Sequence, residues 1–128
     1  MDCPKCTGEL QLTTYGEDIR VRRCDACAGL WCKPDMLERM KAEWMAEAVL
    51  DTGDPRIGRG LDEVDDIDCP EGHGKLKKTS DERQTHIWYE TCESCRGIFL
   101  DAGEFTDLKF ESLLDHVRGF VKGARSSD

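Results

Sequence analysis

Three pairs of cysteines, each with two residues between its members, constrain the fold of this 128-residue chain more than any other feature. The pairs are Cys3 and Cys6, Cys24 and Cys27, and Cys92 and Cys95. A further motif, CPEGH, places His73 four residues after Cys69. Within each half of the chain, 17 or 18 residues separate the two motifs. This spacing is typical of zinc sites in which two short loops each supply half of a tetrahedron, and it predicts zinc binding in each half.

Two other uses of paired cysteines remain as alternatives. Eight cysteines permit a disulfide framework, but such scaffolds are typical of secreted proteins. The opening residues, MDCPKC, have neither the charged nor the apolar region of a secretory signal. A thioredoxin-like redox pair occurs singly on a βαβ scaffold, rather than twice at matched intervals. Zinc is therefore the favoured interpretation.

The two halves of the sequence resemble each other. CPKCTGEL (residues 3–10) aligns with CPEGHGKL (residues 69–76), and CDACAGLW aligns with CESCRGIF. Such self-similarity indicates two copies of one small unit. The segment between them is rich in acidic residues and glycine, which predicts a linker. The expected organisation is a first unit over residues 1–50, a linker over residues 51–67, a second unit over residues 68–122 and a frayed tail over residues 123–128.

Each unit is predicted to contain a β-hairpin. Residues 9–14 and 19–23 flank a turn in the first unit, and residues 75–79 and 83–91 flank a turn in the second. His86 is expected on the last of these strands, as an ordinary surface residue.

Small and aromatic residues follow the second cysteine pair of each unit. Gly29 and Gly97 are expected to adopt a left-handed backbone in the metal-binding loop. Trp31 and Phe99 come two residues later, and we expect each to be wedged between its hairpin and the following helix.

Two segments have the period of an amphipathic helix. Pro34 suits a first helical turn, and apolar residues continue from Met36 to Ala48 at helical spacing. The second segment carries a wide apolar stripe with polar residues opposite. The stripe consists of Phe110, Leu113, Leu114, Val117, Phe120 and Val121. A unit of about 35 residues has too small a core to bury this stripe alone, so we expect it to pack within the chain, across a homodimer or against a protein partner.

CPKCTGEL, CDACAGLW and CESCRGIFLDAGEF together resemble the bacterial zinc-ribbon family of transcription factor IIB-type zinc fingers. The family pattern is Cys-Pro-x-Cys, a hairpin, and Cys-x-x-Cys-x-Gly followed by an aromatic residue, Leu-Asp and Gly-Glu. The resemblance covers about two thirds of the chain, in two tandem copies. It implies a small zinc-dependent α+β fold with two tandem zinc ribbons, each followed by an α-helix. It implies much less about activity, because one fold hosts many functions.

Carried over residue by residue, the resemblance implies two zinc ions per chain. The ligands of the first are Cys3, Cys6, Cys24 and Cys27, and those of the second are Cys69, His73, Cys92 and Cys95. Two positions depart from the family pattern. His73 supplies an imidazole where a thiolate is expected. Cys32 stands where the second copy has Leu100, which favours a buried free thiol.

The net charge of the chain makes nucleic-acid binding a less favoured function. The chain has 18 basic and 27 acidic residues, a net charge of −9, and metal-bound thiolates make it more negative. A phosphate backbone would be repelled, so a nucleic-acid-associated factor that uses the basic runs on the hairpins is the less favoured alternative.

An enzyme is not expected. Four protein ligands at each zinc ion leave no position for a catalytic water, and no motif of a known catalytic site is present. Asp101 and Glu104 form a carboxylate pair, but we expect them to interact with the free amides at a helix start.

The favoured function is a structural zinc protein that acts as a protein–protein interaction adaptor or modulator, in a role linked to transcription. A redox or zinc sensor, whose thiolates release zinc on oxidation, is a further alternative. No apolar run reaches the length of a membrane span, and we expect a cytoplasmic protein.

Overall fold

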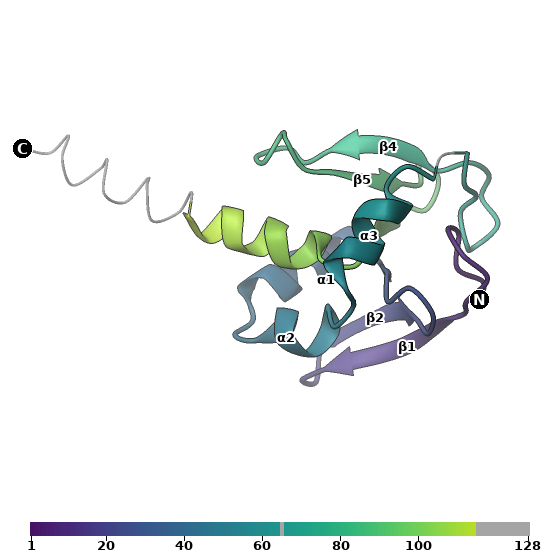
Figure 1. Ribbon diagram of the computed structural model, residues 1–128. Helices are drawn as coiled ribbons and strands as arrows, with labels where there is room; N and C mark the ends of the chain where they lie inside the picture. The colour runs from purple at the N-terminus through teal and green to yellow at the C-terminus, as the bar shows by residue number, and fades with distance from the viewer. Residues whose placement is uncertain (65, 115–128) are drawn as a thin grey trace, which may run out of the picture.

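Six short strands form one antiparallel sheet in the computed structural model, which describes residues 1–64 and 66–114 (Figure 1). The strands are β1 (Leu10–Tyr15), β2 (Ile19–Cys24), β3 (Leu30–Cys32), β4 (Lys77–Ser80), β5 (Trp88–Thr91) and β6 (Ile98–Leu100). Their order across the sheet is β1-β2-β3-β6-β5-β4. The three strands of each half are neighbours, and the halves join through β3 and β6. The prediction of a small α+β fold is confirmed.

The pairing of β3 with β6 places sequence-equivalent residues around one point. Trp31 pairs with Phe99, Leu30 with Leu100, and Cys32 with Ile98. Trp31 and Phe99 occupy the same position in the alignment of the two halves, so a local two-fold axis passes through this pair. The sequence did not predict β3 or β6, because three residues are too few to show a period.

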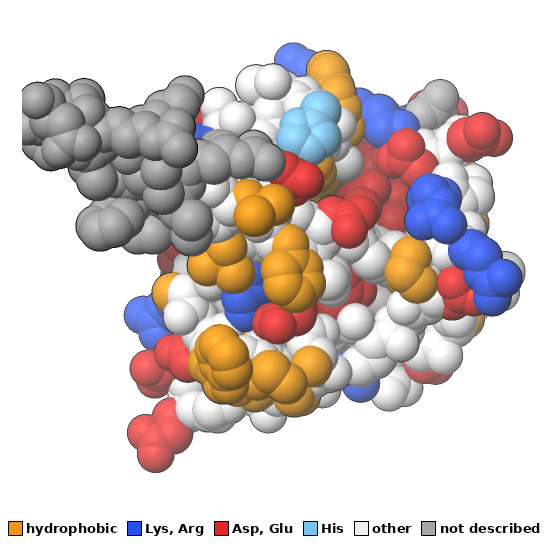
Figure 2. Space-filling model, turned by 60° about the vertical axis from the view of Figure 1, so that its left-hand side comes forward, with side chains coloured by type: hydrophobic (Ala, Val, Ile, Leu, Met, Phe, Trp, Pro, Cys, Tyr) orange, Lys and Arg blue, Asp and Glu red, His pale blue; other side chains and the backbone are white. Residues whose placement is uncertain are grey.

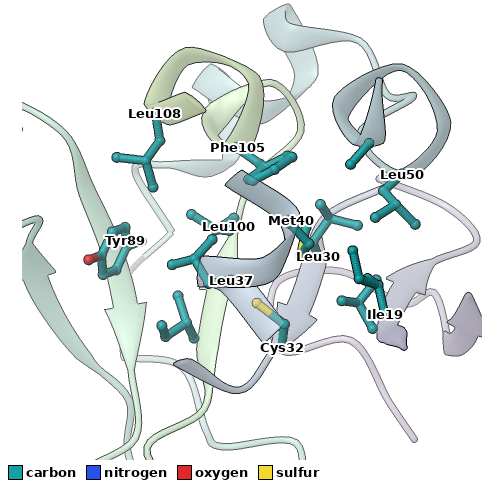
Figure 3. Packing of buried hydrophobic residues seen from close by; sticks show 13 residues of the cluster. Ile19, Leu30, Cys32, Leu37, Met40, Leu50, Tyr89, Leu100, Phe105 and Leu108 are labelled. Atoms are coloured by element: carbon teal, nitrogen blue, oxygen red, sulfur yellow. The ribbon is translucent and has the colours of Figure 1, made fainter. Parts of the chain in front are cut away.

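Alternation of side chains along these two strands divides the core into two clusters. On one face, residues such as Leu30 and Leu100 pack against helical residues that include Leu37 and Phe105 (Figure 3). On the other face, Trp31 and Phe99 pack among the paired cysteines. The expectation that these aromatics are wedged between each hairpin and the following helix is therefore wrong, because the pleat turns them away from the two helices that follow the hairpins.

Pro34 begins a helix as predicted, but this helix is shorter than expected. α1 spans Pro34–Ala42 and α2 spans Ala46–Leu50. Between them, Met45 has a left-handed backbone with φ of 65°, which a continuous helix does not allow. The chain turns here and leaves the Trp44 side chain 83% exposed.

The segment over residues 51–67, expected as a linker, is part of the packed structure. It contains α3 (Pro55–Leu61), whose N-cap Asp54 accepts a hydrogen bond from the Arg56 amide. Asp51 accepts hydrogen bonds from the backbone amides of Gly103 and Thr106, both at 2.9 Å. It thereby caps the helix that follows β6, although that helix begins about 50 residues later in the chain.

The second hairpin has a longer loop than predicted. β5 begins at Trp88, and the residues before it belong to a loop arranged around Asp81. One Asp81 carboxylate oxygen accepts from the amides of Arg83 and Gln84, and the other accepts from the Tyr89 hydroxyl at 2.9 Å. These bonds replace a strand ladder, so His86 lies in a loop rather than on a strand.

A fourth helix occupies residues 104–114 of the described chain. Its first turns bury Phe105 and Leu108 in the helical core. Three residues of the predicted stripe, Phe110, Leu113 and Leu114, are exposed. The other three, Val117, Phe120 and Val121, lie outside the described residues, as does the predicted tail. Among the described residues, none of the helices has the length and apolar character needed to cross a membrane.

Candidate metal centres

Four cysteine side chains of the first half converge on one point. Within the set Cys3, Cys6, Cys24 and Cys27, a sulfur of each residue lies within 4.8 Å of all the others. Cys3 Sγ lies 3.8 Å from Cys27 Sγ, and Cys6 Sγ lies 3.4 Å from Cys24 Sγ. Four ligands at Zn–S bonds of about 2.3 Å place sulfurs about 3.8 Å apart in a regular tetrahedron. The sulfurs therefore fit a zinc ion, and all eight cysteines are free of disulfides.

The second cluster combines three thiols with one imidazole. Its members are Cys69, His73, Cys92 and Cys95, again within 4.8 Å of one another. Cys69 Sγ lies 3.8 Å from Cys95 Sγ and 3.5 Å from His73 Nδ1. A shorter zinc–nitrogen bond of about 2.0 Å brings sulfur and nitrogen to about 3.5 Å, so the distance to His73 also fits tetrahedral zinc. The two clusters are compatible with two zinc ions, as predicted.

The loops that carry the ligands repeat the same backbone hydrogen bonds in both halves. The Cys3 amide donates to the Gly8 carbonyl at 3.0 Å, and the Cys69 amide donates to the Gly74 carbonyl at 2.7 Å. In the second loop of each half, the Cys24 and Cys92 amides donate in the same way to the residues five positions on, both at 2.9 Å. Equivalent residues thus form equivalent loops, although CPEGH lacks the second cysteine of CPKC.

Backbone amides also point at the sulfurs. The Gly8 amide donates to Cys6 Sγ and the Ala26 amide donates to Cys24 Sγ, both at 3.3 Å. In the second cluster, the Cys95 amide donates to Cys92 Sγ at 3.5 Å. Such bonds stabilise thiolates, which are the form that binds zinc.

The glycines of these loops have a different role from the one expected. The left-handed positions are Ala28, with φ of 61°, and Arg96, with φ of 65°. Gly29 and Gly97 instead make room for an aromatic ring of the opposite half. A Cβ atom at Gly29 would lie 2.4 Å from the Phe99 ring, and one at Gly97 would lie 2.2 Å from the Trp31 ring.

Cys32 lies on β3 in the helical core, away from both clusters. Its side chain is buried, and this burial raises the pKa of the Cys32 thiol to about 12. A thiol with such a pKa is neutral and inert at neutral pH. The structure therefore places Cys32 where the sequence predicted it, as a free thiol in an apolar environment.

Two ion pairs connect the halves at equivalent positions. Lys5 Nζ lies 2.6 Å from Asp101 Oδ2, and Lys33 Nζ lies 2.7 Å from Glu71 Oε2. Lys5 aligns with Glu71, and Lys33 aligns with Asp101, so these two contacts are equivalent with their charges reversed. Trp31 Nε1 also donates to Glu71 Oε2 at 2.9 Å. The hydrogen bond from Lys33 lowers the pKa of the Glu71 carboxyl.

Sequence reasoning missed the burial of Lys5. Its side chain is fully buried and also lies 2.7 Å from Glu90 Oε1. Burial alone lowers the pKa of an ammonium, but the bonds to Asp101 and Glu90 outweigh it and raise the pKa of Lys5. Burial raises the pKa of both carboxyls, because one ammonium does not compensate two buried carboxylates. Asp101 was expected to interact with helix amides, whereas Glu104 does so by accepting from the Asp101 amide at 3.0 Å.

Comparison with known proteins finds a similarity for the N-terminal third of the chain. No curated protein and no solved structure matches the chain. A family model described as a transcription factor zinc-finger, the TFIIB-type zinc ribbon, matches residues 2–43. The match contains the whole first cluster, β1 to β3 and α1, and it ends before the second cluster. The N-terminal part of the chain is thus similar to a TFIIB-type zinc ribbon.

Proposed function

We propose that this chain is a non-catalytic protein with two tandem zinc ribbons, each followed by a helix, and that it binds a protein partner in a role linked to transcription. The family match supports the first ribbon, and the recurrence of the loop hydrogen bonds supports the second. Each cluster supplies four protein ligands, which complete a tetrahedron and favour a structural role for zinc. The link to transcription rests on the description of the matching family.

The observation that carries the interaction role is a set of exposed apolar side chains on two joined segments. The 104–114 helix exposes about half of each of Phe110, Leu113 and Leu114, and the segment around α2 exposes Trp44, Met45 and Val49. We call these six residues the apolar patch.

Lys109 joins the two segments of the apolar patch. Its ammonium donates to the Glu43 carbonyl and lies 2.6 Å from Glu47 Oε2. Figure 2 shows hydrophobic side chains gathered on this side of the molecule, with acidic side chains beside them. Contiguous exposed apolar surface with a polar rim is typical of protein interaction sites. The partner therefore presents an apolar surface with basic residues at its edge.

We infer that nucleic-acid binding is the less favoured alternative. On the second hairpin, Lys77 pairs with Glu93 and Lys78 pairs with Asp62. On the first, Arg23 donates to the backbone carbonyls at the end of α2. Basic residues that are neutralised by neighbouring acids do not form the concentrated basic face that phosphate binding needs.

Affinity capture from a native cell extract tests the interaction role. Zinc-loaded protein is compared with a variant carrying Phe110→Asp and Leu114→Asp, and the captured partner is purified for a binding measurement. We expect the variant to keep two zinc ions per chain and to bind the partner at least about tenfold more weakly, because charge is placed in an apolar contact. The matched control is Leu12→Asp, which changes an equally exposed leucine on β1, far from the apolar patch in the sequence.

Three outcomes would contradict the proposal in whole or in part. Equal retention of the same proteins by the patch variant and the wild type would remove the apolar patch as the binding surface. Sedimentation showing a wild-type dimer that the patch variant dissociates would make the surface a homodimer interface rather than a site for another protein. A captured partner with no part in transcription would contradict the transcription link alone.

A further inference from the structure

A third cluster of potential ligands, made of oxygen atoms only, lies outside the two cysteine clusters. One carboxylate oxygen from each of Asp62, Glu90 and Asp101 lies within 4.8 Å of the others. Asp62 follows α3, Glu90 lies on β5, and Asp101 follows β6. The cluster therefore sits where the segment over residues 51–67 meets the second half of the sheet.

Two carboxylates of this cluster are buried, and some of their oxygens have no hydrogen-bond donor. Glu90 is 3% exposed and Asp101 is 1% exposed. Glu90 Oε2, Asp101 Oδ1 and Asp62 Oδ1 are inaccessible to solvent, and none of them accepts a hydrogen bond within the described chain. A buried carboxylate oxygen without a donor is destabilising unless a proton or a cation binds it. Asp62 Oδ1 has Lys78 at 3.5 Å, whereas no ion pair is formed by Glu90 Oε2 or Asp101 Oδ1 in the described chain, so these two oxygens indicate a missing positive charge.

The charges in and around the cluster do not balance. Lys5 is the buried cation that contacts Glu90 and Asp101, and Lys78 lies 3.5 Å from Asp62 at the outer side. Glu104 adds a further carboxylate beside Asp101. Burial, together with the negative charges of Asp101 and Glu90, raises the pKa of Glu104 to about 9. With all four carboxyl groups ionised, the two ammonium groups leave two negative charges, which one divalent cation would balance; without a cation, Glu104 keeps its proton and one negative charge remains.

A pocket adjoins the cluster at Asp62, the one of its three members that lines it. Asp62 and Glu104 line a cavity of about 300 Å³, together with Gly58, Ala102 and Gly103. A side chain at position 58 is excluded from the wall of this cavity, because a Cβ atom there would lie 2.1 Å from the Ala102 carbonyl oxygen. The cavity is large enough for a cation that keeps several of its water ligands.

We propose that Asp62, Glu90 and Asp101, with Glu104 beside them, form a third metal site that binds a hard divalent cation such as Mg²⁺, Ca²⁺ or Mn²⁺. Carboxylate oxygens and water are the ligands that these ions prefer, whereas the thiolate clusters select zinc. A cation at this position connects α3 to β5 and to the start of the 104–114 helix. The site is independent of the proposed partner binding, since it involves no residue of the apolar patch.

Titration of the zinc-loaded protein with Mn²⁺ tests this site, with free Mn²⁺ measured by electron paramagnetic resonance and zinc content measured in parallel. We expect one Mn²⁺ per chain with a Kd below about 1 mM, competition by Mg²⁺ or Ca²⁺, and two retained zinc ions. Asp101→Asn and Asp62→Asn are each expected to weaken binding at least about tenfold. Asp62 is half-exposed, so its variant remains informative if Asp101→Asn does not fold.

Glu17→Gln is the control, because Glu17 is exposed and belongs neither to the pocket nor to the cluster. We expect it to bind Mn²⁺ within about twofold of the wild type. Absence of saturable binding to the wild type, equal binding by Asp62→Asn, or binding that occurs only as zinc is lost would each overturn the proposal. In the first of these cases, protons rather than a metal ion neutralise the cluster.

Discussion

Trp31 and Phe99 show at the residue scale how two small zinc units become one structure. Each ring lies over a glycine of the opposite half, Phe99 over Gly29 and Trp31 over Gly97. Each also lies near a lysine, with Lys5 5.8 Å from the centre of the Phe99 ring. A zinc unit of this size has too small a core to bury a large aromatic ring alone, so each half covers the ring of the other.

The close contact between Gly97 and Trp31 predicts that a methyl group added at Gly97 destabilises the fold. In Gly97→Ala, the added Cβ would meet the Trp31 ring, which belongs to a buried, rigid side chain. We expect the free energy of unfolding to fall by about 1–3 kcal/mol, measured by denaturant titration of zinc-loaded protein. Gly60→Ala is the control, because it lies in α3 and has open space around it, and it should be neutral or stabilising by up to about 1 kcal/mol. Equal stability of the two variants would contradict this role of Gly97.

Substitution of the buried Lys5 is expected to cause a larger loss of stability. Lys5→Met removes the buried ammonium but leaves Glu90 and Asp101 without a partner in the sheet interior. Removing one member of a buried ion pair costs about 3–5 kcal/mol. We expect a decrease of about 3 kcal/mol in the unfolding free energy, and we expect Asp101→Asn in the same chain to restore part of it. A loss below about 1 kcal/mol in Lys5→Met, at unchanged zinc content, would show that the pair does not stabilise the fold.

At the scale of elements, charge explains why β3 pairs with β6. Three equivalent positions near the junction carry basic residues in the first half and acidic residues in the second. They are Lys5 and Glu71, Arg22 and Glu90, and Lys33 and Asp101. Pairing of two first halves through the same contacts would bring lysine against lysine, and pairing of two second halves would bring carboxylate against carboxylate. Such repulsion favours the pairing of unlike halves.

Exchange of the charges of Lys33 and Glu71, the partly exposed ion pair, tests whether charge favours the pairing of β3 with β6. Lys33→Glu and Glu71→Lys should each lower the free energy of unfolding by up to about 1 kcal/mol. Each variant places two like charges where an ion pair with an N–O distance of 2.7 Å now lies. The double variant should recover most of the loss, which gives a coupling energy of about 1 kcal/mol in a double-mutant cycle. Unfolding and zinc content are measured for all four proteins. Additive losses would mean that the charges do not specify the pairing.

The same elements show what local sequence can predict. The strands of the first hairpin were predicted to within one residue at each end, because a short turn separates two regular strands. The eight metal ligands were also predictable, since their spacing within each loop is local. β3, β6 and the Lys5 cluster were not predictable, because they exist only through contacts between the halves. The Asp81 loop was missed because one side chain replaces the strand bonds.

At the scale of the whole molecule, the two clusters of core residues make the metal sites interdependent. The cluster around Trp31 contains cysteines of both metal sites, including Cys3 and Cys69. The helical cluster contains residues of both central strands, such as Leu30 and Leu100. We therefore expect loss of one site to expose apolar surface of the other half, which would couple zinc binding to folding across the chain.

Substitution of His73 tests the coupling between zinc binding and folding in the two halves. It is the exposed ligand of the second cluster and lies between two glycines with left-handed backbones, Gly72 and Gly74. His73→Ala leaves three thiolates, and we expect native mass spectrometry to show one retained zinc ion per chain instead of two. The variant should also melt at a lower temperature in one transition, because β6 no longer has an ordered partner on its outer side and β3 depends on β6. His86→Ala, a change at an exposed loop residue that belongs to neither cluster, should keep two zinc ions and the wild-type melting temperature. Two separate transitions in the His73 variant, with the first half melting as in the wild type, would show that the halves fold independently.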